Sequence, residues 1–221
     1  MRKLGVKAAA AAVILASPAA AEMEYSFYIG SQSAPHSVLS GTIDGTAGTA
    51  IDSTVAWEGR STAPPPYYGM RGVYWRESGW GYGLEFTHAK AYASDADRAS
   101  LGFDSLEFTD GHNIITANIH RRWKNQWWNG RLTPFVTAGV GVAMPHVDIQ
   151  HGGGAHTFGY QLTGPAARLG AGVSMAITDR MSAFTEYQFT YSDNKIDLDS
   201  GGTLETSLIT NALNFGISYS F

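Results

Sequence analysis

The sequence contains no cysteine among its 221 residues. Disulfide bonds, thiolate metal sites, iron–sulfur clusters and cysteine nucleophiles are therefore excluded. Beyond its first 21 residues, the chain also lacks any apolar run of the roughly 20 residues that a membrane-spanning helix needs. Any membrane span in the rest of the chain must therefore be built from strands, because exposed backbone groups find no water in lipid.

The N-terminus has the pattern of a secretory signal peptide. Three basic residues, Arg2, Lys3 and Lys7, precede a short apolar run that closes on small residues at positions 19–21. This pattern predicts a cleaved signal peptide over residues 1–21 and one mature domain over residues 22–221. Cleavage removes three basic residues and no acid, so the mature chain is more acidic than the whole-chain net charge of −4. We therefore expect no nucleic-acid partner.

Apolar and small or polar residues alternate in eight segments of the mature chain. They cover residues 23–29, 68–74, 82–86, 115–119, 136–142, 169–175, 183–189 and 213–221. The connections alternate between short turns (76–79, 124–131, 178–180) and longer polar stretches (33–56, 93–111, 146–159, 192–207). Alternating turn length is typical of outer-membrane barrels. The alternative is a secreted β-sandwich, which gives no reason for this alternation.

The predicted fold is therefore all-β: an eight-stranded antiparallel transmembrane β-barrel with short periplasmic turns and longer extracellular loops. Its expected location is the outer membrane of a Gram-negative cell. The C-terminal strand is rich in aromatic residues and ends on Phe221. This ending resembles the signal that the barrel-assembly machinery reads during insertion, so that machinery is an expected partner. The sequence carries no signal for an oligomeric state.

Four charged residues fall at inward positions in the middle of the predicted strands. Buried charges must be paired. We expect Arg71 to pair with Glu85, and Arg168 to pair with Glu186, since each pair lies on neighbouring strands. An eight-stranded barrel is narrow enough for such side chains to fill it. The alternative is a catalytic or proton-relay role for these residues.

Six of the seven histidines fall at the predicted outer end of the barrel. Three of them, His36, His88 and His146, end alternate strands, where a rigid frame could bring them to one metal ion with Glu58, Glu107 or Asp110. The alternative is that loops simply collect polar residues. The outer end has few cations, and Arg60 and Lys90 are the candidates for binding lipopolysaccharide phosphates. Ordinary solvated loop charge is the alternative for these two.

Particular stretches resemble known families. Residues 132–141 and 184–188 resemble strands of small barrels related to the membrane domain of outer membrane protein A. More specifically, Ser33-Ala-Pro-His-Ser37, Trp57-Glu-Gly-Arg-Ser61 and Glu85-Phe-Thr-His-Ala-Lys90 resemble proteins described as lipid A oxidases. Further stretches over residues 65–69, 106–111, 160–165 and 201–205 share this resemblance, which covers most of the mature chain.

The resemblance implies oxygen-dependent oxidation of the proximal glucosamine of lipid A to 2-aminogluconate. Oxygen reacts with a closed-shell sugar only through a flavin, haem or redox metal, and no segment resembles a nucleotide-binding fold. We therefore expect iron or copper, held by His36, His88 and His146, with Glu58 as a ligand or proton acceptor and Arg60 and Lys90 holding the substrate. The rivals are a non-enzymatic structural or surface-binding barrel and a small channel.

Overall fold

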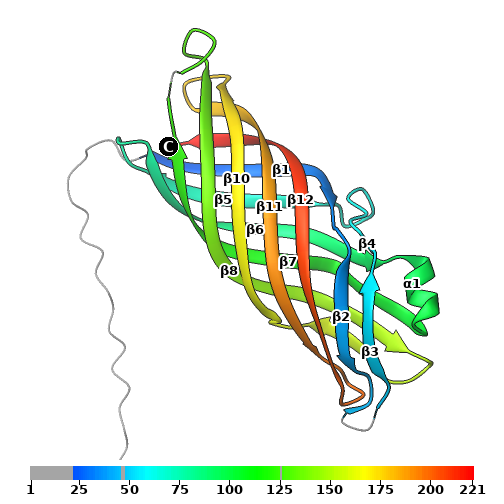
Figure 1. Cartoon of the computed structure of the whole chain (residues 1–221). Helices are drawn as coiled ribbons and strands as arrows, with labels where there is room; N and C mark the ends of the chain where they lie inside the picture. Colours follow the sequence, from blue (N-terminus) through cyan, green and yellow to red (C-terminus); the bar gives the residue numbers. More distant parts are fainter. Residues whose placement is uncertain (1–21, 46–47, 125) are drawn as a thin grey trace, which may run out of the picture.

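The computed structural model describes residues 22–45, 48–124 and 126–221, so the predicted signal peptide lies outside the described residues. Eight strands form a closed antiparallel ring, because β12 pairs with β11 on one side and with β1 on the other (Figure 1). In ring order they are β1 (Glu22–Ser33), β5 (Tyr68–Trp75), β6 (Trp80–Ala93), β7 (Phe103–Arg122), β8 (Leu132–His151), β10 (Gly164–Ala176), β11 (Met181–Asp197) and β12 (Thr203–Ser220). The predicted eight-stranded antiparallel barrel is confirmed.

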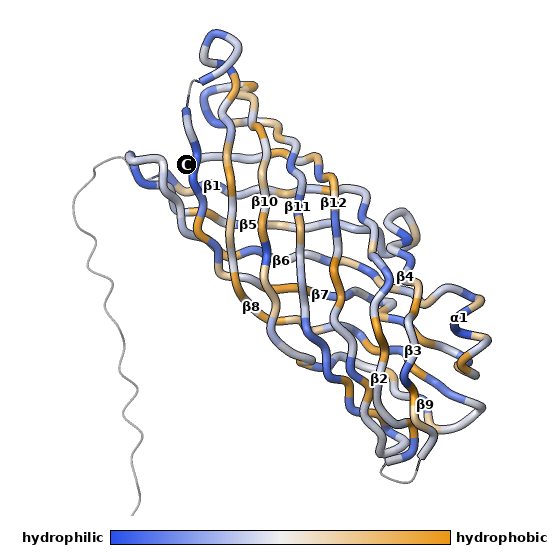
Figure 2. Tube along the Cα trace, in the orientation of Figure 1, coloured by the Kyte–Doolittle hydropathy of each residue, from blue (hydrophilic) through white to orange (hydrophobic). Residues whose placement is uncertain are grey.

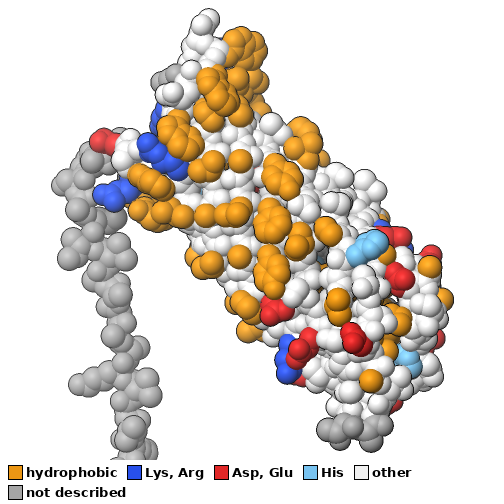
Figure 3. Space-filling model, viewed as in Figure 1, with side chains coloured by type: hydrophobic (Ala, Val, Ile, Leu, Met, Phe, Trp, Pro, Cys, Tyr) orange, Lys and Arg blue, Asp and Glu red, His pale blue; other side chains and the backbone are white. Residues whose placement is uncertain are grey.

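The outer wall of the barrel carries an apolar belt. On β1, exposed Tyr25, Phe27 and Ile29 alternate with buried Ser26 and Tyr28. On β12, Phe215 leaves 56% of its surface exposed while its neighbour Asn214 is fully buried. The same belt covers the face shown in Figure 3, with charged side chains gathered at the two ends. Apolar residues outside and polar residues inside are the arrangement of a barrel that faces lipid.

The sequence predicted long outer loops, and this prediction is wrong in one respect: most residues of these connections form strands. β7 and β8 continue far beyond the apolar belt, and residues 33–56 contain a hairpin of β2 (Ser37–Thr42) and β3 (Ala50–Val55). β2 adds to β12, β4 (Trp57–Glu58) adds to β6, and β9 (His156–Tyr160) adds to β8. The sheet therefore continues outward beyond the apolar belt, and we call this part the outer extension (Figures 1 and 2).

This outer extension is filled by an apolar core. Its inward side chains include Leu39, Trp57, Phe108, Val147 and Leu204, each at most 5% exposed. The alternation of the strands continues into the extension, and its inward positions turn from polar to apolar. Burial of these side chains stabilises strands that lie beyond the lipid. The core closes the outer end of the lumen.

A single short helix among the described residues, α1 (Asp95–Ser100), connects β6 to β7. Ser94 caps its N-terminus by accepting a hydrogen bond from the backbone N–H of Asp97. Within the described part of the chain, no helix has the length and apolar character needed to cross a membrane.

Candidate functional site

The outer wall changes from apolar to polar along β6, β7 and β8. Two successive rows of outward side chains in the belt are aliphatic or aromatic. They are Leu84–Ala117–Val140 and Phe86–Ile115–Val142. The next row outward is His88 on β6, Asn113 on β7 and Met144 on β8, so the change to polar side chains begins on β6 and β7. The polar positions therefore start where the lipid-facing rows end.

His88 and Asn113 form a buried polar pair on this wall. Nδ1 of His88 lies 3.0 Å from Oδ1 of Asn113, and each residue is 5% exposed. The ring of Tyr68 stacks on His88 at a centroid distance of 5.0 Å. A donating Nδ1 leaves Nε2 as an acceptor, and that atom has no hydrogen-bond partner within the described residues. The imidazole is thus held in place with one nitrogen available.

Two cations lie against the ring of Tyr92, one row further out. Nζ of Lys90 is 5.7 Å from the ring centroid, and the guanidinium of Arg60 is 4.4 Å from it. Lys90 is fully buried and donates to the backbone oxygen of Ala63 at 2.8 Å. Arg60 is exposed and pairs with Glu58 at 2.9 Å. The positive φ of Arg60, 36°, places its backbone in a region that L-residues rarely adopt.

An acidic strip borders the cations on β7 and β8. Glu107 lies opposite Asp148 in register, and burial, with a smaller contribution from Asp148, raises the pKa of the Glu107 carboxyl. Nδ1 of His146 lies 4.0 Å from Oδ2 of Asp110. His146 sits edge-on between the rings of Phe158 and Tyr160 of β9, at 4.5 and 4.8 Å.

The structure places five of the six predicted outer-end site residues on one wall. Glu58, Arg60, His88, Lys90 and His146 come from β4, the segment after it, β6 and β8. Asn113, Tyr92 and Tyr160 also lie on this wall and were not among the predicted site residues. Continuing the outward alternation of β7 past Ile115 would have found Asn113.

The predicted three-histidine metal site is not formed. His36 lies exposed between β1 and β2, where its charge helps to lower the pKa of Asp97 in α1. His88 and His146 extend from strands separated by β7, and each packs against aromatic rings. Across residues 22–45, 48–124 and 126–221, no group of three or more histidine or carboxylate side chains could hold a metal ion. The described residues therefore do not fit the expected iron or copper centre, and we derive no chemical step through one.

The lumen contains the four predicted charged residues, with partners exchanged. Arg71 lies 2.6 Å from Glu186 and 4.0 Å from Glu85, while Arg168 lies 2.7 Å from Glu85. Register alone sets Arg71 opposite Glu85, but the long side chains reach across the barrel to non-neighbouring strands. The hydroxyl of Tyr28 also donates to Glu85 at 2.7 Å. This network occupies the middle of the lumen.

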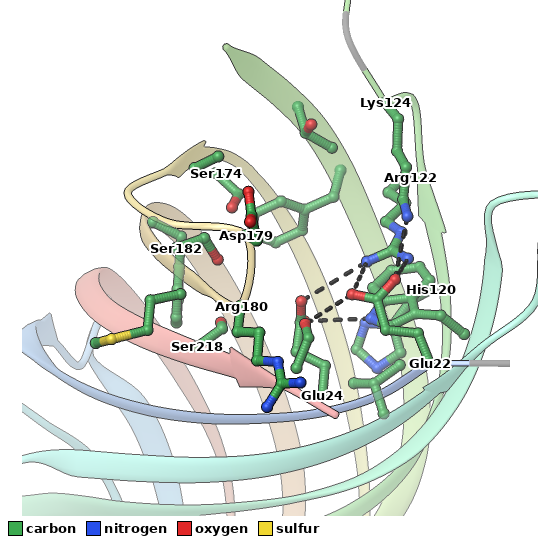
Figure 4. Close-up of a pocket in the computed structure, with 18 of the residues that line it drawn as sticks. Glu22, Glu24, His120, Arg122, Lys124, Ser174, Asp179, Arg180, Ser182 and Ser218 are labelled. Carbon is green, nitrogen blue, oxygen red and sulfur yellow. Dashed lines mark hydrogen bonds and ion pairs between the residues drawn. The ribbon is translucent and has the colours of Figure 1, made fainter. Parts of the chain in front are cut away.

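A pocket of 350 Å³ lies below that network at the short-turn end (Figure 4). Four of its charged residues pair with one another: Arg122 lies 2.5 Å from Glu22 and 3.7 Å from Glu24, and Lys124 lies 3.1 Å from Glu22. These cations hold the pKa of Glu22 at about 2, against an opposing effect of burial. The pairing leaves little net charge in the pocket for a ligand.

The fold defines a class: this is an outer-membrane β-barrel of the small, eight-stranded kind. Neisserial surface protein A has a similar structure, with a TM-score of 0.52 and 13% identity over 90% of this chain and 97% of that one. Ail of Yersinia pestis and the N-terminal barrel of Pseudomonas aeruginosa OprF are more distant, each with a TM-score of 0.41 at 14% and 12% identity. They cover 91% and 90% of this chain and 99% and 97% of their own.

The likeness to Neisserial surface protein A establishes the fold alone, since 13% identity is far below the level at which function carries over. No protein-family model matches the chain, and no curated protein matches it. Function must therefore be argued from the outer wall itself.

Proposed function

We propose that this barrel acts on lipid A in the outer leaflet and oxidises its proximal glucosamine to 2-aminogluconate. The observation that carries the proposal is the order of the outward side chains on this wall. The lipid-facing rows of β6, β7 and β8 lie below, and the polar residues His88, Lys90 and Arg60 lie directly above them. Lipid A presents acyl chains and a phosphorylated sugar in the same order. The reaction itself is what the sequence resemblance implies.

The polar rows supply complementary groups for such a head group. Arg60 and Lys90 would hold a phosphate or carboxylate, and the free Nε2 of His88 would accept a hydrogen bond from a sugar hydroxyl. Glu58 is bound to Arg60, so we assign it the role of holding that guanidinium rather than the predicted role of metal ligand or base. The oxidation would pass two electrons and two protons from the C1 hemiacetal of the sugar to oxygen, giving a lactone and hydrogen peroxide, and water would then open the lactone to the acid. The described residues assign no group to the electron transfer.

Substrate entry would require movement of the segment that covers the site. Lys90 is fully buried beneath residues 61–67 through its bond to Ala63, and the ring of Tyr68 covers His88. Three consecutive prolines, at positions 64–66, stiffen that segment. We infer that it moves as one piece.

A non-enzymatic barrel that binds lipopolysaccharide is the second candidate. It is favoured by the failure of the described histidines and carboxylates to form a three-ligand metal group. Both candidates use the same wall, so they are separated by two measurements on the same protein, the oxidised product and the bound lipid A.

The test is mass spectrometry of lipid A from cells that lack the protein and from cells that express wild-type, His88→Ala or His36→Ala protein. We expect 2-aminogluconate only when the protein is present. His88→Ala should reduce it about tenfold, the usual effect of one lost hydrogen bond, and His36→Ala should not. If the barrel purified from wild-type cells carries bound lipid A, but the lipid A of those cells contains no 2-aminogluconate, the barrel is a lipopolysaccharide-binding scaffold. If neither product nor bound lipid A is found, the proposal is wrong.

A further inference from the structure

The lipid-facing wall contains a groove of 740 Å³ that crosses β6, β7, β8 and β10 and reaches Phe189 on β11. Its floor includes the small side chains Ala117, Ala138 and Ala167, which lie on three neighbouring strands. Larger side chains stand around them, among them Tyr82 and Leu169, which are 49% and 57% exposed. The groove is therefore a depression in an otherwise projecting belt.

The groove lies at a definite depth below the polar rows. Ala117 is four residues along β7 from Asn113, or about 14 Å at the rise of an antiparallel strand. Tyr82 is six residues along β6 from His88, about 20 Å by the same rise. With a strand tilt of about 45°, the distance of about 20 Å between Tyr82 and His88 along β6 corresponds to a depth of about 14 Å along the membrane normal. This depth is close to half of a hydrocarbon core of about 30 Å. The groove and the proposed head-group site thus span about one leaflet.

We propose that this groove binds one acyl chain of the lipid whose head group occupies the outer wall. The identity of that lipid rests on the proposed function. At this depth the surrounding medium is hydrocarbon, so neither water nor a polar ligand would fill an apolar depression. A long acyl chain reaches from the polar rows to the groove and packs against its floor on the same strands.

The small floor residues then select the substrate by its acyl chain. A chain that is long enough contacts Ala117, Ala138 and Ala167, and a shorter chain ends above them. Head-group contacts at Lys90 and His88 and chain contacts in the groove together distinguish lipid A from lipids that share only one of these features.

The test measures lipid A retained by the full mature barrel, extracted from outer membranes in mild detergent and examined by native mass spectrometry. Ala138→Phe fills the floor, and Ala167→Phe serves if the first variant does not fold. Either should reduce retained lipid A about tenfold, equivalent to the loss of about ten close carbon–carbon packing contacts with the floor. Ala183→Phe, at an outward position of β11 that does not line the groove, is the matched control and should retain lipid A as the wild type does.

Heat-dependent mobility on gels verifies that each variant is folded. Retention by folded Ala138→Phe and Ala167→Phe equal to that of Ala183→Phe overturns the acyl-chain proposal, even if 2-aminogluconate is formed. Conversely, reduced retention in the groove variants together with no 2-aminogluconate in wild-type cells supports the groove and rejects the oxidase. The two proposals therefore fail separately.

Discussion

Arg168 and Glu85 lie 2.7 Å apart in the lumen, although β7 and β8 separate their strands in the ring. Both side chains are almost completely buried. Glu85 also accepts a hydrogen bond from Tyr28 and one from the amide of Asn118 at 2.9 Å. One carboxylate on β6 thus connects the neighbouring strand β7 with the more distant strands β1 and β10 through the centre of the barrel.

Glu85→Gln should destabilise the folded barrel by about 3 to 5 kcal/mol, because it leaves the Arg168 guanidinium buried without its counter-charge. The measurement is the temperature at which the folded band is lost on gels. Glu205→Gln is the control, since Glu205 pairs with Lys195 on the surface, where such pairs contribute at most about 1 kcal/mol. Equal heat resistance of the two variants would show that Glu85 is not part of a stabilising network.

Tyr28→Phe should also lower stability, by about 1 to 3 kcal/mol, because it removes a buried hydroxyl that bonds to the Glu85 carboxylate and to the hydroxyl of Thr87. Denaturant unfolding in detergent micelles measures the change. Tyr25→Phe removes the same hydroxyl from a lipid-facing tyrosine that is 54% exposed, and should have little effect. A loss of the same size in both variants would contradict a specific role for the lumen hydroxyl.

Lys90→Met should loosen the segment that covers the outer wall. The variant keeps an unbranched apolar side chain but loses the bond from Nζ to the Ala63 oxygen. Amide exchange of Tyr67, whose N–H donates to the Ser61 oxygen within this segment, should speed up about tenfold. Lys195→Met, at an exposed surface pair, serves as the control. Unchanged exchange at Tyr67 would mean that Lys90 does not hold the segment closed.

The attachment of α1 to the β3–β4 connection should depend on pH. A hydrogen bond from the Ala56 backbone N–H to Asp97, with a second from Ser94, lowers the pKa of the Asp97 carboxyl. A lowered folded-state pKa gives stabilisation that is present above the ordinary value and is lost as pH falls through the folded-state value.

The Ala56 amide resonance should therefore shift as the pH falls below about 4, the usual range for aspartate. Asp97→Asn should abolish this titration, and Asp95→Asn, at a residue of the same helix that makes no bond to Ala56, should leave it in place. An Ala56 resonance that stays constant over this range would contradict the assignment.

The barrel follows from local sequence patterns. Alternation at positions such as Leu213, Phe215 and Ile217 identifies a strand with one lipid-facing side, and this signal requires no knowledge of the neighbouring strands. The same rule assigned Arg71, Glu85, Arg168 and Glu186 to inward positions. The same rule, continued two residues beyond the predicted strand at Ile115, places Asn113 outward.

Within the barrel wall, the sequence by itself thus determined which residues are strand and which side each faces, because both depend on a period of two along the chain. Only the tertiary structure decided which partners meet. Curvature of the barrel brings Arg168 to Glu85 rather than to Glu186, and it leaves His36, His88 and His146 in separate surroundings. The outer extension was missed for a related reason: its strands are stabilised by a shared apolar core, formed by Leu39, Phe108 and Leu204 from distant segments, which no single segment encodes.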